Sequence, residues 1–315
     1  MNKLLLIALG GLLAQLVDGS LGMGFGATST TLLLALAAMN PASASAVVHV
    51  AELGTTLASG VSHWRFNNID WKVVLRLGLP GAVGAFAGAT LLSNLSLATA
   101  KPVMATILTL IGINLVLRFS TGRRTARGTG APAAPRTLGF LGLFGGFVDA
   151  AGGGGWGPVT SSTLMSIGKT EPRRIVGTVN TAEFLVTLAA SLGFVLGMWQ
   201  DLTEHLLAVL ALLAGGVLAA PVAAWLVTRI NPTALGGFVG TCLAVTHLPY
   251  LIGLIPALAP YSLPLTLAAA LTGLALSTRG VLRSRQLAPH RPTGYQETVS
   301  PSLHTLATST TRTKD

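Results

Sequence analysis

Long stretches without a charged side chain constrain the fold of this chain more than any other feature of its sequence. No Asp, Glu, Lys or Arg occurs in residues 19–51, 77–100 or 230–278. A helix needs about 20 predominantly apolar residues to cross the hydrocarbon core of a membrane. Charged residues make up only 10% of the 315 residues, against roughly 25% in soluble domains. The sequence therefore predicts an all-α polytopic membrane protein and excludes a water-soluble enzyme.

The positive charges lie in short segments between the apolar runs, and they predict the orientation in the membrane. The polar segment 120–137 carries four arginines, and several more follow residue 278. By the positive-inside rule both segments are cytoplasmic. The net charge of +10 is thereby attributed to topology, and no nucleic-acid partner is expected. We predict a multi-pass protein of the cell inner membrane, with residues 120–137 as a cytoplasmic linker and 288–315 as a disordered cytoplasmic tail.

An internal repeat divides the chain into two halves. A shift of 131 residues aligns residues 12–59 with residues 143–190 without a gap. Leucine and alanine matches mean little in this composition, but acidic residues are rare in it, and glycine and proline are placed for backbone reasons. The matches of this kind are Val17-Asp18 with Val148-Asp149, Gly22, Gly24 and Gly26 with Gly153, Gly155 and Gly157, Pro41 with Pro172, and Glu52 with Glu183. We expect residues 1–119 and 138–257 to form homologous halves, followed by an extra C-terminal helix in 258–287.

Each half opens with two apolar segments that are too short to span comfortably. These segments are 4–17 and 28–39 in the first half, and 138–148 and 159–167 in the second. A helix of 14 residues rises about 21 Å, whereas the hydrocarbon core is about 30 Å thick. We therefore predict two re-entrant hairpins with glycine-rich tips, although pairs of short full spans remain an alternative.

Three longer helices follow each hairpin in this interpretation. They are predicted at residues 44–62, 73–92 and 102–119, and at 175–197, 206–227 and 232–255, with the extra helix at 262–282. Three crossings, an odd number, give the halves opposite orientations and make the repeat inverted. Only Lys3 and Lys101 then fall on the side that the positive-inside rule disfavours. The two tips would meet near the membrane midplane.

The predicted tips have the chemistry of a small anion site. Closely spaced glycines let the backbone turn and bring its N–H groups close to a ligand, and a helix N-terminus with exposed N–H groups favours an anion. The residues that we expect to bind the substrate are Gly22, Gly24, Gly26, Thr28 and Ser29 in the first half, and Gly153, Gly155, Trp156, Gly157, Thr160 and Ser161 in the second. The alternatives are that the glycines serve close helix packing and that the hydroxyls bond to carbonyls of their own helix.

Two aspartates precede the tips. Asp18 and Asp149 lie in or near the membrane, where a charge is costly enough to indicate a function. A structural alternative is that each carboxylate accepts N–H groups of its tip as a helix cap.

Each of the next helices carries one glutamate. Glu52 has His49 three residues before it, and Glu183 has Asn180 in the same relation, so each pair shares a helical face. A carboxyl and an imidazole there can carry a proton in coupled transport, while an interhelical hydrogen bond is the plainer interpretation. The six histidines are scattered without ligand spacing, so we expect no metal, no cofactor and no catalytic residues.

The duplicated glycine-rich segments, 18–26 and 149–157, are each followed by a Ser/Thr-rich helix start and, after a proline, by a helix that carries a glutamate. In these features the sequence resembles the TauE/SafE-type sulfite exporter family. The resemblance covers residues 4–282. It implies a bacterial inner-membrane permease for small sulfur-containing anions such as sulfite, sulfoacetate, thiosulfate or sulfate, often exporting waste from organosulfonate breakdown. The sequence selects neither the anion, the direction of transport, the coupling ion nor the oligomeric state, and a homodimer is left open.

We therefore expect a secondary transporter, an exporter by resemblance, that binds a small sulfur-containing anion where the tips meet and releases it by rocking of one half against the other. A channel is disfavoured because the tips would block a continuous pore. The alternative from another class is a non-transporting membrane assembly or quality-control factor whose glycines serve packing alone.

Overall fold

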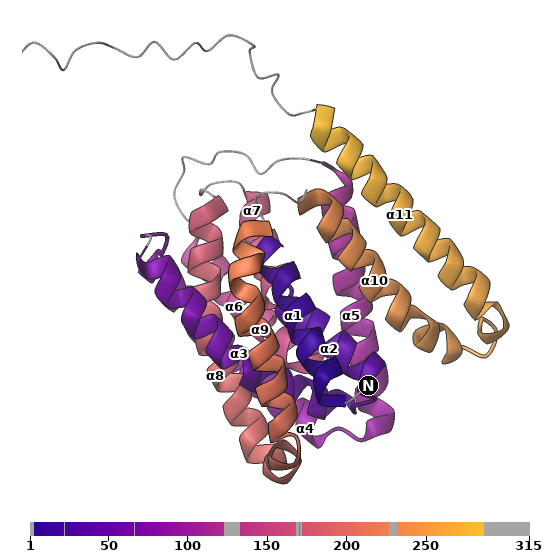
Figure 1. Cartoon of the computed structure of the whole chain (residues 1–315), viewed down its shortest axis with the longest axis horizontal. Helices are drawn as coiled ribbons and strands as arrows, with labels where there is room; N and C mark the ends of the chain where they lie inside the picture. Colours follow the sequence, from indigo (N-terminus) through magenta and orange to yellow (C-terminus); the bar gives the residue numbers. More distant parts are fainter. Residues whose placement is uncertain are drawn as a thin grey trace, which may run out of the picture.

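The computed structural model describes residues 3–21, 23–65, 67–122, 133–167, 170, 172–226 and 232–286. Within these ranges every regular element is a helix. Figure 1 shows a bundle in which the longer helices run roughly side by side, with α11 (Ser262–Gln286) at its outer edge. The all-α architecture predicted from the sequence is confirmed.

Five helices precede the linker and six follow it, counting only the residues described above and leaving two short turns aside. The first group is α1 (Lys3–Leu21), α2 (Phe25–Leu36), α3 (Pro41–Arg65), α4 (Trp71–Asn94) and α5 (Leu97–Ser120). The second is α6 (Pro135–Gly152), α7 (Ser162–Ile167), α8 (Pro172–Glu204), α9 (Leu206–Leu226), α10 (Pro232–Gly253) and α11. A π-helical turn, η1 (Gly157–Ser161), leads into α7, and a 3₁₀ turn, η2 (Ala259–Tyr261), leads into α11. Helices therefore lie at every apolar segment expected from the sequence.

Proline and aspartate fix several helix starts. Proline occupies the first position of α3, α6, α8 and α10, where its missing N–H has no intrahelical partner to lose. Asp70 caps α4 by accepting the N–H groups of Lys72 and Val73 at 3.1 and 3.3 Å. The repeat-related Pro41 and Pro172 thus begin the corresponding helices α3 and α8.

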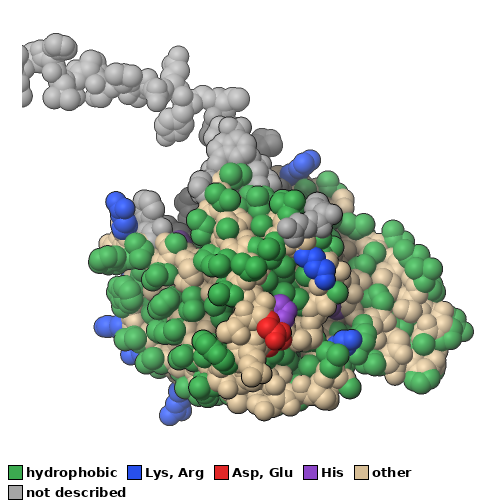
Figure 2. Space-filling view, turned by 60° about the horizontal axis from the view of Figure 1, so that its bottom comes forward, with side chains coloured by type: hydrophobic (Ala, Val, Ile, Leu, Met, Phe, Trp, Pro, Cys, Tyr) green, Lys and Arg blue, Asp and Glu red, His purple; other side chains and the backbone are tan. Residues whose placement is uncertain are grey.

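Several helices have the length and composition of membrane spans. In the part of the chain that the structure describes, five qualify: Trp71–Asn94, Leu97–Ser120, Arg174–Glu204, Thr233–Gly253 and Ala259–Gln286. Figure 2 shows a face on which hydrophobic side chains are spread widely and lysine and arginine side chains are few. Leu196 on α8 and Leu218 on α9 keep 76% and 73% of their surface exposed. Such a surface is suited to lipid rather than water, and the polytopic membrane fold is supported.

Helices of the two halves pack across each other. α1 packs along α9 and α6 along α4, while α3 contacts α8 and α5 contacts α10. The shift of 131 residues that aligns the halves converts the α4–α6 pair into the α9–α1 pair. Glycines allow these close approaches: a Cβ at Gly11 would overlap the carbonyl oxygen of Leu212, and one at the repeat-related Gly142 would overlap that of Leu77. The halves are thus interlocked and do not form separate bundles.

The glycine-rich breaks are shorter than the sequence predicted. α1 continues to Leu21, beyond the expected end at Val17, and α2 already starts at Phe25. In the second half the break falls between α6 and the π-helical turn, where Gly153 and Gly154 have φ of 69° and 136°. Gly24, Gly153 and Gly154 have a positive φ and lie in the breaks, whereas Gly26 and Gly152, whose φ is not positive, stay in α2 and α6. α2, with 12 residues, rises about 18 Å, well short of a core about 30 Å thick.

Candidate functional site

The two glycine-rich breaks lie against each other inside the bundle. A Cβ placed on Gly26 would come within 2.8 Å of the Cα of Gly154. A Cβ on Gly157 would come within 2.6 Å of the Cβ of Met23. The shift of 131 residues converts one of these contacts into the other. The tips thus meet through a duplicated close contact that leaves no room for a side chain at Gly26 or Gly157.

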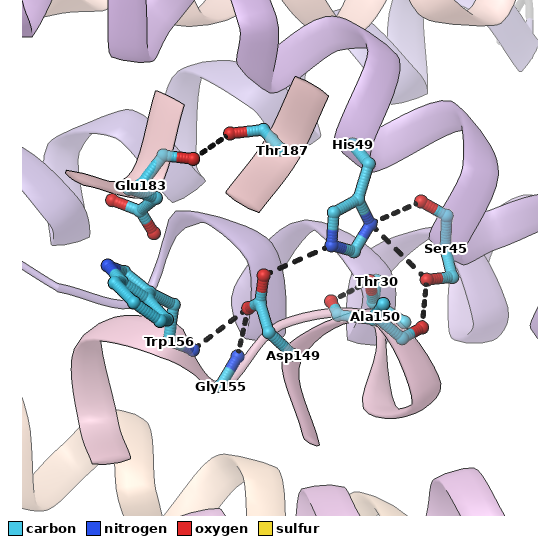
Figure 3. Close-up of polar contacts among 10 residues, drawn as sticks. Thr30, Ser45, His49, Asp149, Ala150, Gly155, Trp156, Glu183 and Thr187 are labelled. Carbon is cyan, nitrogen blue, oxygen red and sulfur yellow. Dashed lines mark hydrogen bonds and ion pairs between the residues drawn. The ribbon is translucent and has the colours of Figure 1, made fainter. Parts of the chain in front are cut away.

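Hydrogen bonds reinforce the contact between the halves. The hydroxyl of Thr30 donates to the carbonyl oxygen of Gly153, as drawn in Figure 3. The hydroxyl of Ser45 on α3 donates to the carbonyl oxygen of Ala150 at 2.8 Å. Both donors come from the first half and both acceptors lie at or beside the second tip. Carbonyls that the end of α6 leaves unpaired are satisfied in this way.

Asp149 caps the second tip. Its Oδ1 accepts the backbone N–H groups of Gly155 at 2.7 Å and Trp156 at 2.8 Å. In the first half the carboxylate of Asp18 accepts the N–H of Phe25, the counterpart of Trp156 in the repeat. Carboxylates of the protein therefore already hold N–H groups that the sequence analysis assigned to a substrate. An anion at the tips has to bind beside these caps or displace them.

His49 and Asp149 form a pair across the two halves (Figure 3). Their Nε2 and Oδ2 atoms lie 3.2 Å apart, with His49 wholly buried and Asp149 2% exposed. The other ring nitrogen, Nδ1, lies 2.8 Å from the carbonyl oxygen of Ser45 and donates to it, because a carbonyl can only accept. Nε2 then bonds to the carboxyl group only if either the imidazole or the carboxyl carries an additional proton. The hydrogen bond at Nε2 therefore places one proton between the imidazole and the carboxyl group.

The glutamates of the repeat lie within range of the same charges. Glu52, 3% exposed, interacts electrostatically with Asp149, His49 and Asp18. Glu183 interacts with Glu52, Asp18 and Asp149. In both helices a threonine four residues further on donates to the glutamate's own backbone carbonyl, Thr56 to Glu52 and Thr187 to Glu183. Four carboxyl groups that are distant in sequence, of which Asp18 and Glu183 are only partly buried, thus interact with one another and, among the described residues, with the imidazole of His49.

Asn180 stands in the second half where His49 stands in the first. Its Nδ2 donates to Ser59 Oγ at 3.3 Å, which links α8 to α3. The amide thus makes the plain interhelical hydrogen bond that the sequence analysis weighed, whereas His49 pairs with a carboxyl group. The repeat therefore duplicates the carboxyl groups of the site but not its imidazole.

Besides Thr30 and Ser162, which bond across the two halves, the hydroxyls beyond the tips fall into two groups. Thr31, Thr160 and Thr163 donate to carbonyls four residues earlier in their own helices. Ser29 and Ser161 are completely buried, and their hydroxyls, like that of Thr28, have no hydrogen-bond partner among the described residues. Buried polar atoms without a partner are rare, and each needs an explanation such as a ligand or water. These three hydroxyls are therefore the strongest binding candidates of the predicted set.

The other predicted residues are placed as follows. Trp156 is fully buried, and its indole Nε1 donates to the carbonyl oxygen of Val179 at 3.1 Å, so its side chain anchors the second tip to α8. Gly24 adopts left-handed backbone with φ of 110°. A Cβ at Gly155 would lie 3.1 Å from side-chain atoms of Ile111 and Val148 and 3.6 Å from the backbone N of Asp149. Gly22 lies outside the described residues. No group of three or more His, Cys, Asp or Glu side chains in the described part of the chain is arranged to hold a metal ion.

Sequence reasoning overlooked Arg118 and Ser45. The guanidinium of Arg118, on α5, donates to Ser162 at the start of α7 and contacts the sulfur of Met23 at 3.7 Å, so it touches elements of both hairpins. A lone arginine inside the predicted span 102–119 was a signal that could have identified it. Ser45 gave no such signal, because serine is common in this composition.

Comparisons with known proteins decide the family. The family profile described as "Sulfite exporter TauE/SafE" matches residues 7–250. The chain belongs to the TauE/SafE family. A curated relative, the "Probable membrane transporter protein YtnM" of Bacillus subtilis (strain 168), is 47% identical over 242 residues, which cover 76% of this chain and 80% of the relative. No solved structure matches the chain. Membership in the TauE/SafE family and this relative support a membrane transporter, as the resemblance implied.

Proposed function

We propose that this TauE/SafE protein is a secondary transporter, working as an exporter, of a small sulfur-containing anion such as sulfite or an organosulfonate. The observation that carries the proposal is the meeting of two repeat-related glycine segments inside the bundle. Ser29 and Ser161, in the helical segments that follow them, have buried hydroxyls without a hydrogen-bond partner among the described residues. Broken helices from two related halves form the binding sites of many transporters. The family name supports a sulfur anion, and the relative's name supports transport.

The halves are related as an inverted repeat in this proposal. Residues 1–119 and 138–257 each comprise a re-entrant hairpin and three spans, with the tips near the midplane. The exchange of packing partners, α1 with α9 and α6 with α4, supports a two-fold relation. The duplicated contacts Gly26–Gly154 and Gly157–Met23 support it independently. We further propose an inner-membrane location with the linker and tail in the cytoplasm; residues 288–315 lie outside the described residues.

Transport by alternating access follows from the direct contact of the tips. A substrate cannot pass between Gly26 and Gly154 while their backbones touch, so the tips have to separate. A movement of one tip relative to the other would open the site toward one side of the membrane at a time. This argument favours a carrier over a channel.

Proton coupling is the mechanism that best reconciles the carboxyl groups with an anionic substrate. Four carboxylates in one buried region would repel an anion strongly, because like charges are poorly screened at low dielectric. Protonation of Glu52 and Glu183, together with the proton held by His49 and Asp149, leaves only the carboxylate of Asp18, which accepts the N–H of Phe25, and so reduces that repulsion. Anion binding would therefore require proton uptake on the same side of the membrane, and both would be released on the other.

The experiment that tests the proposal is uptake of radiolabelled sulfite, sulfate, thiosulfate and sulfonates into proteoliposomes. We expect saturable flux of at least one of these anions, above that of protein-free vesicles. Reconstituted, folded protein without flux of any of them would favour the alternative of a non-transporting assembly or quality-control factor.

A further inference from the structure

Arg118 places a guanidinium beside both hairpins. It belongs to the last turn of α5, and its Nη1 donates to the hydroxyl of Ser162 and contacts Met23 Sδ at 3.7 Å. Its Nη2 lies 2.9 Å from Met165 Sδ. Met23 packs on Gly157 at the contact of the tips, and Ser162 begins the helix that leaves the second tip. The guanidinium thus contacts residues that themselves belong to the tips or adjoin them.

The guanidinium is poorly satisfied by these contacts. A guanidinium has five N–H donors, and thioether sulfur is a weak acceptor. Among the described residues, Ser162 supplies the one oxygen that accepts a hydrogen bond from Arg118. The aromatic ring of Phe119 lies 5.4 Å from its Cζ. No ion pair in the described part of the chain includes Arg118. A partly buried charge without an opposite charge is costly unless it has a use.

Arg118 lies near the end of α5 that leads into the linker. α5 ends at Ser120, where the arginine-rich segment 120–137 begins, which is predicted to be cytoplasmic. The guanidinium therefore lies between this predicted cytoplasmic end of α5 and the elements of the tips that it contacts, Met23 and Ser162. The planar fork of an arginine matches two oxygens of an oxyanion, which a lysine ammonium cannot do.

We propose that Arg118 binds the transported oxyanion at an outer site between the predicted cytoplasmic face and the tips. This inference rests on the proposed function and adds a residue to the path. Sulfite, sulfate and sulfonates present the same chemistry, a compact group of three or four oxygens around sulfur. The phosphate of a lipid headgroup presents similar oxygens, so the test has to separate the two sources.

Initial rates of sulfite transport in proteoliposomes test the inference, measured from each side for the wild type, Arg118→Gln and Arg118→Lys. We expect Arg118→Gln to raise the apparent KM from the side on which α5 ends by roughly 10- to 100-fold, the loss expected for a charge-assisted hydrogen bond. Arg118→Lys should raise it less, because the charge is kept. Lys101→Gln is the matched control, since Lys101 is an exposed cation near the other end of the same helix. The Lys101→Gln variant should keep the KM of the wild type.

The possible results separate the two proposals. If wild-type protein carries no anion, the proposed function fails; if wild-type flux is normal and Arg118→Gln leaves the KM unchanged from both sides, only the outer site fails. Should Arg118→Gln not fold, the KM of Arg118→Lys decides, and an unchanged value overturns the inference. The rates are measured in phosphatidylcholine vesicles with and without phosphatidylglycerol. An effect of the substitution that occurs only with the anionic lipid would assign the guanidinium to a headgroup and overturn the inference as well.

Discussion

Nε2 of His49 lies 3.2 Å from Oδ2 of Asp149, and this contact joins the two halves of the chain at their buried centre. The repeat would place the counterpart of this contact between Asn180 and Asp18. Asn180 instead donates to Ser59. A duplicated backbone therefore carries one titratable pair rather than two. This asymmetry makes His49 the first residue to test for proton coupling.

Replacing His49 by asparagine gives the first half the residue that the second half already has. An amide cannot take up a proton near neutral pH, so we expect His49→Asn to insert normally but to lose the acceleration of transport by a proton gradient. The measurement is initial flux of a transported sulfonate, whose own charge is constant near neutral pH, with and without an imposed gradient. His205→Asn is the control, since His205 also faces an aspartate, Asp201 at 3.7 Å, but at the end of α8. A full gradient response in His49→Asn would contradict proton storage by the pair.

Two substitutions of Asp149 separate its two roles. Asparagine keeps an oxygen that can accept from Gly155 and Trp156, but it removes the charge opposite His49. We expect Asp149→Asn to unfold near the wild-type temperature while its transport no longer responds to a proton gradient. Asp149→Ala removes the cap as well, which should cost about 1–2 kcal/mol of stability. Thermal unfolding in detergent and flux in proteoliposomes measure the two effects. Equal loss of stability in both variants would show that the charge, and not the cap, holds the tip.

The sequence was most informative where a backbone requirement was duplicated. The repeat identified Gly26 and Gly157, and the structure places both at the contact between the tips. It could not identify Gly154, because the residue at the equivalent position in the first half is Met23. Position 154 needs glycine because the backbone of the other half lies against it. Aligning the sequence with itself does not detect such a contact.

Partnerships between residues of different helices were beyond sequence reasoning. His49 was paired with Glu52 because the two share a helical face, whereas its direct partner is Asp149, 100 residues away. Periodicity relates residues within one helix, and only the crossing of α3 over the second tip brings this pair together. The same holds for Arg118 and Ser162, which belong to different halves.

The closest approach of the tips predicts which glycine is least replaceable. A Cβ on Gly154 would overlap the backbone N of Ala27, and its φ of 136° disfavours any side chain. We expect Gly154→Ala to abolish transport and lower thermal stability, because the backbone cannot move aside as a flexible side chain would. Gly139→Ala is the matched control. Gly139 belongs to the same half as Gly154, and a Cβ there would meet nothing within 4 Å. Flux of sulfite in proteoliposomes should distinguish the two variants. Normal transport by Gly154→Ala would mean that the tips do not touch during the cycle.

The two repeat-related glutamates can be tested with a neutral isostere. If anion binding requires both carboxyl groups to be protonated, glutamine at Glu52 and Glu183 mimics the protonated state permanently. The double variant should bind the anion at high pH, where the wild type binds it poorly, but exchange it without net accumulation, because no proton is released with the substrate. Thermal-shift titration with sulfate over a range of pH measures binding, and exchange against net uptake in proteoliposomes measures coupling. Glu204→Gln, a change of an exposed acid at the end of α8, should leave both unchanged. Binding by the double variant that weakens with pH as in the wild type would place the required protons elsewhere.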